Sequence, residues 1–73
     1  MSENEAKKER FRRLATLRTN AVLQRLKVLG NCANRQAYDY TEEEVKRIFS
    51  TIEEQLKIVR SRFQFLRESK FKL

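Results

Sequence analysis

The chain of 73 residues contains no histidine, no proline and no tryptophan, and it has only one glycine and one cysteine. Without histidine, the serine and threonine residues and Cys32 lack the imidazole that commonly activates a nucleophile, and no Cys/His set can hold a zinc ion. A single cysteine cannot form an internal disulfide, so Cys32 is interpreted as an inert turn residue rather than a reactive thiol. The residue types present therefore predict no catalytic residue, no metal site and no cofactor, and the protein is not expected to be an enzyme.

Long apolar runs are also missing. The N-terminus is charged and has no apolar run of signal-peptide length, and no segment approaches the about 20 apolar residues of a membrane span. A cytoplasmic protein without a membrane partner is the expectation. A chain of 73 residues makes one small domain, spanning 1–73. Because so small a core seldom offsets chain entropy without a disulfide, a metal or a partner chain, we expect self-association.

The helical pattern breaks only between Gly30 and Thr41. Gly30 follows a long periodic apolar run, and it is predicted to close the first helix in the left-handed conformation. Thr41 and Glu44 have the spacing of a capping box, in which each side chain bonds the other residue's backbone N–H. Tyr40 and Val45 have the spacing of a hydrophobic staple. Both signals predict that a second helix begins at this point.

The pattern predicts an all-α fold, an antiparallel two-helix hairpin with a helix at about 4–29, a turn at 30–41 and a helix at about 42–69. The second helix has one apolar face, formed by Val45, Ile48, Phe49, Ile52, Leu56, Val59, Phe63 and Leu66. The first helix has two apolar stripes, one with Phe11, Ala15, Val22, Leu26 and Leu29 and the other with Leu14, Leu17, Ala21 and Val28. Two stripes call for two packing neighbours, so the hairpin is predicted to form a homodimeric four-helix bundle.

Arg18 and Arg25 lie between the two stripes of the first helix, where a bundle normally has leucine or alanine. Positions whose numbers sum to about 71 come level in such a hairpin, which sets Arg18 opposite Glu53. One interpretation is a partly buried Arg18–Glu53 pair that fixes the register, with Arg25 reaching a second subunit or extending to water. The other is that both arginines line a groove for phosphate.

Three further residues are candidates for contact with a protein. Ile58 and Phe65 lie nearly opposite the apolar face of the second helix, either as ordinary exposed side chains or as a contact with a second chain. Tyr38 either covers the end of the core or anchors a partner, since tyrosine and arginine are favoured anchors. The predicted partner-binding residues are Arg18, Arg25, Tyr38, Ile58 and Phe65.

The charge distribution indicates a polyanion as the leading partner. The net charge is +7, and residues 1–20 carry six basic and three acidic side chains, 58–73 five and one, and 21–57 six and six. A hairpin brings the two basic terminal segments together at its open end, where nearby phenylalanines suit base stacking. The predicted nucleic-acid-binding residues are Lys7, Lys8, Arg12, Arg13, Arg60, Arg62, Arg67 and Lys70.

The same positive charge fits three alternatives to a nucleic-acid partner. A basic surface also keeps a small oligomer soluble, and a protein-interaction module for an acidic partner has the same charge. A membrane-surface helix is the weakest alternative, because the second helix needs its apolar face for the hairpin.

A resemblance is carried by the run from Arg25 to Arg35, by Tyr38 and by the Tyr-Thr-Glu-Glu helix start at Tyr40. Over about residues 10 to 63 the chain resembles a group of small bacterial helical-hairpin proteins with a Gly-Asn turn. In form it is also similar to Rop-type hairpin dimers, which bind paired RNA loops. The resemblance implies a helical hairpin and assigns no functional residue.

Overall fold

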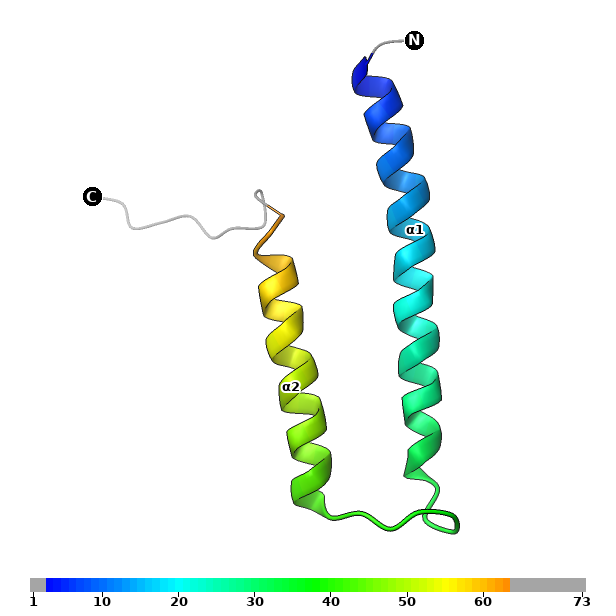
Figure 1. Cartoon of the computed structure of the whole chain (residues 1–73), viewed down its shortest axis with the longest axis vertical. Helices are drawn as coiled ribbons and strands as arrows, with labels where there is room; N and C mark the ends of the chain where they lie inside the picture. The colour runs from blue at the N-terminus through cyan, green and yellow to red at the C-terminus, as the bar shows by residue number, and fades with distance from the viewer. Residues whose placement is uncertain (1–2, 64–73) are drawn as a thin grey trace, which may run out of the picture. The chain divides into compact units, whose positions relative to one another are not determined.

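Residues 3–63 are described by the computed structural model, and they form two helices (Figure 1). Helix α1 spans Glu3–Gly30, the short 3-10 turn η1 spans Asn31–Ala33 and helix α2 spans Glu42–Arg60. Residues 3–63 contain no strand, so the all-α prediction is confirmed. The chain divides into two compact units, Met1–Asp39 and Tyr40–Leu73, and each is described by itself.

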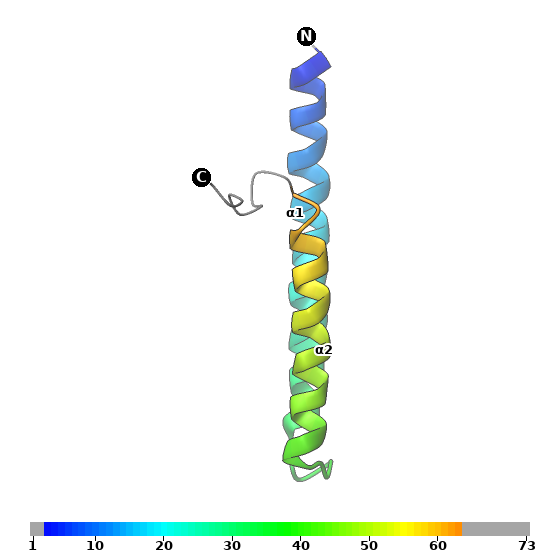
Figure 2. The same cartoon turned by 90° about the vertical axis from the view of Figure 1, so that its left-hand side faces the viewer.

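Helix α1 is continuous over its 28 residues, about 42 Å at the usual rise (Figure 2). Its interior has no glycine or proline and is rich in strong helix formers such as alanine, leucine, arginine and lysine. Glu5 lies in its first turn and Lys27 lies in its last turn, where each charge opposes the helix dipole. The sequence pattern placed this helix at about 4–29.

Gly30 does not take the left-handed conformation, so that prediction is wrong. Its φ of −60° and ψ of −25° are right-handed, and none of the described residues has a positive φ. The chain instead tightens into η1, where the Asn34 N–H donates to the Asn31 carbonyl at 3.4 Å, and then turns extended at Asn34. Asn34 organises the next turn, because its side-chain oxygen accepts from the Gln36 N–H at 3.0 Å and its carbonyl accepts from the Tyr38 N–H at 2.9 Å.

Replacing Gly30 by Ala is expected to stabilise the protein by about 0.5–1 kcal/mol, since a right-handed glycine loses more chain entropy on folding than alanine does. An added Cβ at Gly30 meets no atom within 4 Å. Urea unfolding measures the change. The matched control is Ala21→Gly inside α1, which should lose at least that amount, because Ala21 also lies on an apolar stripe. A destabilised Gly30→Ala variant would show that this position needs the left-handed region after all.

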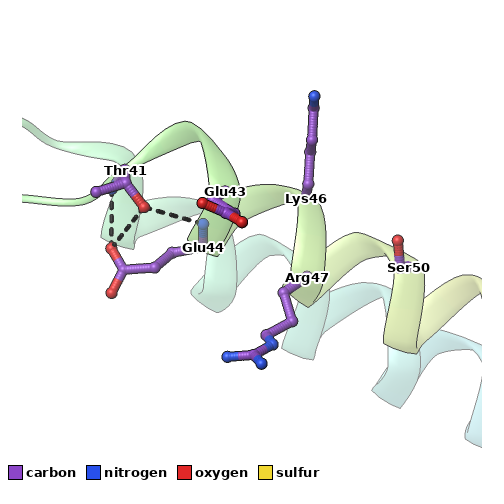
Figure 3. Close-up of a pocket in the computed structure, with 6 residues that line it drawn as sticks. All are labelled: Thr41, Glu43, Glu44, Lys46, Arg47 and Ser50. Atoms are coloured by element: carbon purple, nitrogen blue, oxygen red, sulfur yellow. Dashed lines mark hydrogen bonds between the residues drawn. The ribbon is translucent and has the colours of Figure 1, made fainter.

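Helix α2 begins at the predicted capping box, which is confirmed (Figure 3). The Glu44 N–H donates to Thr41 Oγ1 at 3.0 Å, and the Thr41 N–H donates to Glu44 Oε1 at 2.8 Å. Acidic Glu42, Glu43 and Glu44 occupy the first turn, where they also favour the positive end of the helix dipole. The sequence of this segment therefore fixes where α2 starts.

The helix ends at Arg60, earlier than the predicted limit of about 69. The Ser61 hydroxyl donates to the Ile58 carbonyl at 2.7 Å. The next two N–H groups, of Arg62 and Phe63, bond three residues back, to Val59 and Arg60, each at 3.0 Å. A serine hydroxyl that takes a backbone carbonyl competes with the helical hydrogen bonds, and the i−3 bonds tighten the chain out of the α-helix. Of the predicted apolar face, Leu66 lies outside the described residues.

No side chain among residues 4–63 is fully buried. On the apolar face of α2, the larger side chains are 41% to 51% exposed, and Val45 and Ile52 are half-buried. The stripes of α1 are similarly open, with Leu17 65% and Leu26 41% exposed. Because a single helix cannot cover its own apolar face, both helices present surface that calls for a neighbour. The hairpin and its dimer remain predictions.

Candidate nucleic-acid interface

The positive charge of the described protein belongs to α1. This helix holds eight lysine or arginine residues and three glutamates, a net charge of +5, whereas α2 holds four basic and five acidic residues, a net charge of −1. The helix boundaries thus sharpen the sequence prediction, which divided the charge by terminal segments. A polyanion approaching either helix is attracted to α1.

Five cations cluster in the first half of α1, and we call residues 7–13 the basic segment. Its cations are Lys7, Lys8, Arg10, Arg12 and Arg13, all exposed, and its one acid is Glu9. At 3.6 residues per turn these side chains point to all sides of the helix. A helical segment that is charged on nearly every side cannot enter an apolar core, so its cations face water or an anionic partner, and Phe11, which is 57% exposed, is its one apolar side chain.

Carboxylates are absent from a long stretch that begins in the basic segment. From Arg10 to Tyr38 the sequence has seven basic residues and no aspartate or glutamate. Charge counts over residues 1–20, 21–57 and 58–73 do not reveal this stretch. The middle range counts Lys27 and Arg35 together with the acidic residues at the start of α2, and the two signs cancel. The spacing between consecutive acidic residues in the sequence, from Glu9 to Asp39, is the signal that reveals it.

The C-terminal candidates are placed only in part. Arg60 is the last residue of α2 and Arg62 lies in the turn after it, and both are exposed. Arg67 and Lys70 lie outside the described residues, as does the partner candidate Phe65. Arg60 and the basic segment belong to different units, so their meeting at one positive pole remains a prediction.

The other partner candidates are accessible. Arg18 and Arg25 are exposed on α1, Tyr38 is 54% exposed in the segment between η1 and α2, and Ile58 is 45% exposed on α2. The proposed partner of Arg18, Glu53, is in the other unit, so their ion pair remains a prediction.

A shallow hollow lies over the first turns of α2 (Figure 3), lined by Thr41, Glu43, Glu44, Lys46, Arg47 and Ser50. All of these residues are exposed, and the side chains of Lys46 and Arg47 point in different directions in Figure 3. Glu44 is already bonded to Thr41. Among the described residues, no group of three or more His, Cys, Asp or Glu side chains is arranged to hold a metal ion. The hollow therefore gathers no set of groups that converge on one ligand.

Among residues 3–63, neither helix combines the length and the apolar character that crossing a membrane requires. No family model, curated protein or solved structure matches the chain. Function is therefore inferred from the residues of the chain itself, and the basic surface of α1 is its most distinctive feature.

Proposed function

We propose that this protein is a small, non-enzymatic nucleic-acid-binding protein that contacts phosphates through the basic segment of α1. The observation that carries the proposal is the cluster of five exposed cations around one stretch of helix, followed by a stretch without any carboxylate. If the helices form the predicted hairpin, four further cations extend the same surface, namely Arg60, Arg62, Arg67 and Lys70. Such a surface attracts any strongly anionic polymer.

Binding by this surface is electrostatic. Each lysine or arginine that neutralises a phosphate releases condensed counterions, which supplies most of the affinity in sequence-independent binding. Arginine adds two parallel hydrogen bonds to a phosphate, so Arg12 and Arg13 hold the backbone more firmly than lysine does. Phosphate contacts carry no sequence information, and the chain has no motif for reading bases. The protein is thus expected to bind many sequences with similar affinity.

The proposed architecture is an antiparallel hairpin that dimerises into a four-helix bundle. The open apolar face of α2 suits one stripe of α1, and a second copy covers the remaining stripe. Two copies in one bundle present two basic segments, which doubles the number of phosphate contacts and raises the affinity through a higher local concentration.

Self-association should be visible as a melting temperature that rises with protein concentration, because mass action favours the folded oligomer. Circular dichroism melts over a hundredfold range of concentration measure this shift, and sedimentation equilibrium gives the mass. A monomer mass together with a melt that is independent of concentration would contradict the dimer.

Replacing Arg12 and Arg13 by Gln should weaken binding to duplex DNA and lower the slope of log affinity against log salt by about 2, one for each lost phosphate contact. Fluorescence anisotropy with a labelled duplex measures both quantities. The matched control is Lys46→Gln/Arg47→Gln, which removes the same charge from α2. Equal losses in both variants would mean that net charge alone, and not the basic segment, governs binding.

A further inference from the structure

Arg18 and Arg25 differ from the cations of the basic segment because each is surrounded by apolar side chains of its own helix. Since α1 is continuous here, residues three and four positions away are true neighbours on its surface. For Arg18 these neighbours are Leu14, Ala15, Ala21 and Val22, and for Arg25 they are Ala21, Val22, Val28 and Leu29. We call Arg18, Arg25 and these neighbours the arginine face.

Arg18 and Arg25 lie along the line between the two apolar stripes of α1, and the arginine face includes side chains of both stripes. The two stripes together cover about half of the helix circumference, more than the about 100° of one packing stripe. Val22 is 53% and Val28 46% exposed, whereas Leu14, Ala15 and Leu29 are half-buried, so this surface is partly open in the described protein. Two neighbouring helices are needed to cover it. Whatever covers it must either bring anions to the arginines or leave their guanidinium groups in water, because a cation enclosed in apolar surface without a partner is strongly destabilising.

This chain does not have a helix that satisfies both arginines together. The arginines are seven residues apart, and α1 itself has no carboxylate after Glu9. On α2, Glu53 borders the apolar face, but the positions seven residues before and after it are Lys46 and Arg60. A helix that brings Glu53 to one arginine therefore brings a cation to the other. A helix from a second copy has the same sequence, so it too matches only one of the two arginines.

A phosphate backbone is also a poor match for this face. Phosphates are strongly hydrated and could pair with the arginines, but they would leave the flanking leucine, valine and alanine side chains in contact with water. An amphipathic helix with carboxylates in the middle of its apolar face would cover both kinds of surface at once. The surroundings of Arg18 and Arg25 thus favour a protein helix over a nucleic acid.

We propose that the arginine face binds an amphipathic helix of another protein that carries two carboxylates seven residues apart within its apolar face. Two turns of helix place these carboxylates about 10 Å apart, the same separation as the arginines. This inference rests on the proposed dimer, in which a helix of a second copy occupies this position in the free protein and matches only one of the arginines. The acidic helix replaces that copy and forms a one-to-one complex.

Three synthetic helical peptides of four heptads test the proposal. The first has leucine and isoleucine flanking two glutamates seven residues apart, the second has glutamine at those two positions, and the third has the glutamates moved to the opposite face. We expect the first peptide to bind about tenfold more tightly than the other two by fluorescence anisotropy. Sedimentation should show one peptide bound to one chain.

Protein variants identify the surface. Arg18→Gln/Arg25→Gln should lose the preference for the first peptide, whereas Arg12→Gln/Arg13→Gln, which removes the same charge from the basic segment, should keep it. Circular dichroism checks that each variant is helical, and the comparison of peptides on the parent protein stands even if a variant does not fold. Equal binding of all three peptides to the parent would overturn the proposal. Equal loss of the peptide preference in both variants would also overturn it. So would a loss of duplex DNA affinity in Arg18→Gln/Arg25→Gln as large as in Arg12→Gln/Arg13→Gln, because that result would assign Arg18 and Arg25 to phosphate.

Discussion

Replacing Ile52 by Asp is expected to abolish the cooperative thermal unfolding transition of this protein. Ile52 lies in the middle of the apolar face of α2 and is half-buried, although no described side chain is fully buried. A carboxylate at this position must either lose its hydration or keep the face from packing, a loss on the order of 4 kcal/mol or more. A domain of this size has only about 4–11 kcal/mol of stability to lose. Far-UV circular dichroism during heating measures the transition.

The matched control is Ile58→Asp, which places the same charge on the other side of α2. Ile58 lies nearly opposite the apolar face of α2, and a substitution away from that face should change stability by no more than about 0.5 kcal/mol. If both variants unfold alike, the assignment of the packing face is wrong. If Ile58→Asp keeps its helices but dissociates the oligomer in sedimentation, Ile58 contacts a second chain.

Affinity for duplex DNA should fall about 150-fold when the salt concentration rises from about 50 to 200 mM, if four basic side chains neutralise phosphates on binding. This number follows from a slope of about −0.9 per neutralised phosphate. Because the five cations of the basic segment point to all sides of α1, one segment cannot place four of them on a duplex, and four contacts need the two basic segments of the proposed dimer. Anisotropy titrations at four or more salt concentrations give the slope, and duplexes of unrelated sequence should give the same value.

A flat salt dependence, or no binding at low salt, would remove nucleic acid as the ligand of the basic segment. The protein would then be better described as an interaction module for an acidic protein. Strong dependence on the sequence of the duplex would contradict a different part of the proposal, since phosphate contacts do not distinguish sequences.

The two ends of the connecting segment show why local chemistry predicts some boundaries and not others. Thr41 and Glu44 form a closed set of reciprocal bonds within four residues, and the sequence alone was enough to predict them. Gly30 has no such set. Glycine accepts the left- and right-handed regions about equally, so its conformation depends on the residues after it, and here Asn31–Ala33 continue in a 3-10 turn.

The end of α2 was misplaced for a related reason. The apolar spacing continues through Phe63 and Leu66, and this periodicity alone predicts a helix that extends to about residue 69. The hydroxyl of Ser61, bonded to the Ile58 carbonyl, and the i−3 bonds of Arg62 and Phe63 are local hydrogen bonds that periodicity does not register. Hydrophobic spacing reports which side of a helix is apolar and not where its backbone bonds change.

The candidate interface was predictable in its residues but not in its grouping. The distribution of charge along the sequence predicts Lys7, Lys8, Arg12 and Arg13, and they are exposed on α1. Which other cations join them depends on how α1 and α2 pack, and the two stripes of α1 offer α2 two similar surfaces. Periodicity cannot choose between surfaces of similar apolar character, so the register that would bring Arg60 and Arg62 to the basic segment needs contacts between the helices.

Nuclear magnetic resonance of the isotopically labelled protein, titrated with a short duplex at low salt, reports on the interface residue by residue. The proposed function predicts that amide shift changes concentrate in residues 7–13 of α1, that they disappear at high salt, and that the first turns of α2 change little. Changes centred on Thr41 to Ser50, or no change at a duplex concentration that saturates binding in anisotropy, would contradict the assignment of the nucleic-acid surface to α1.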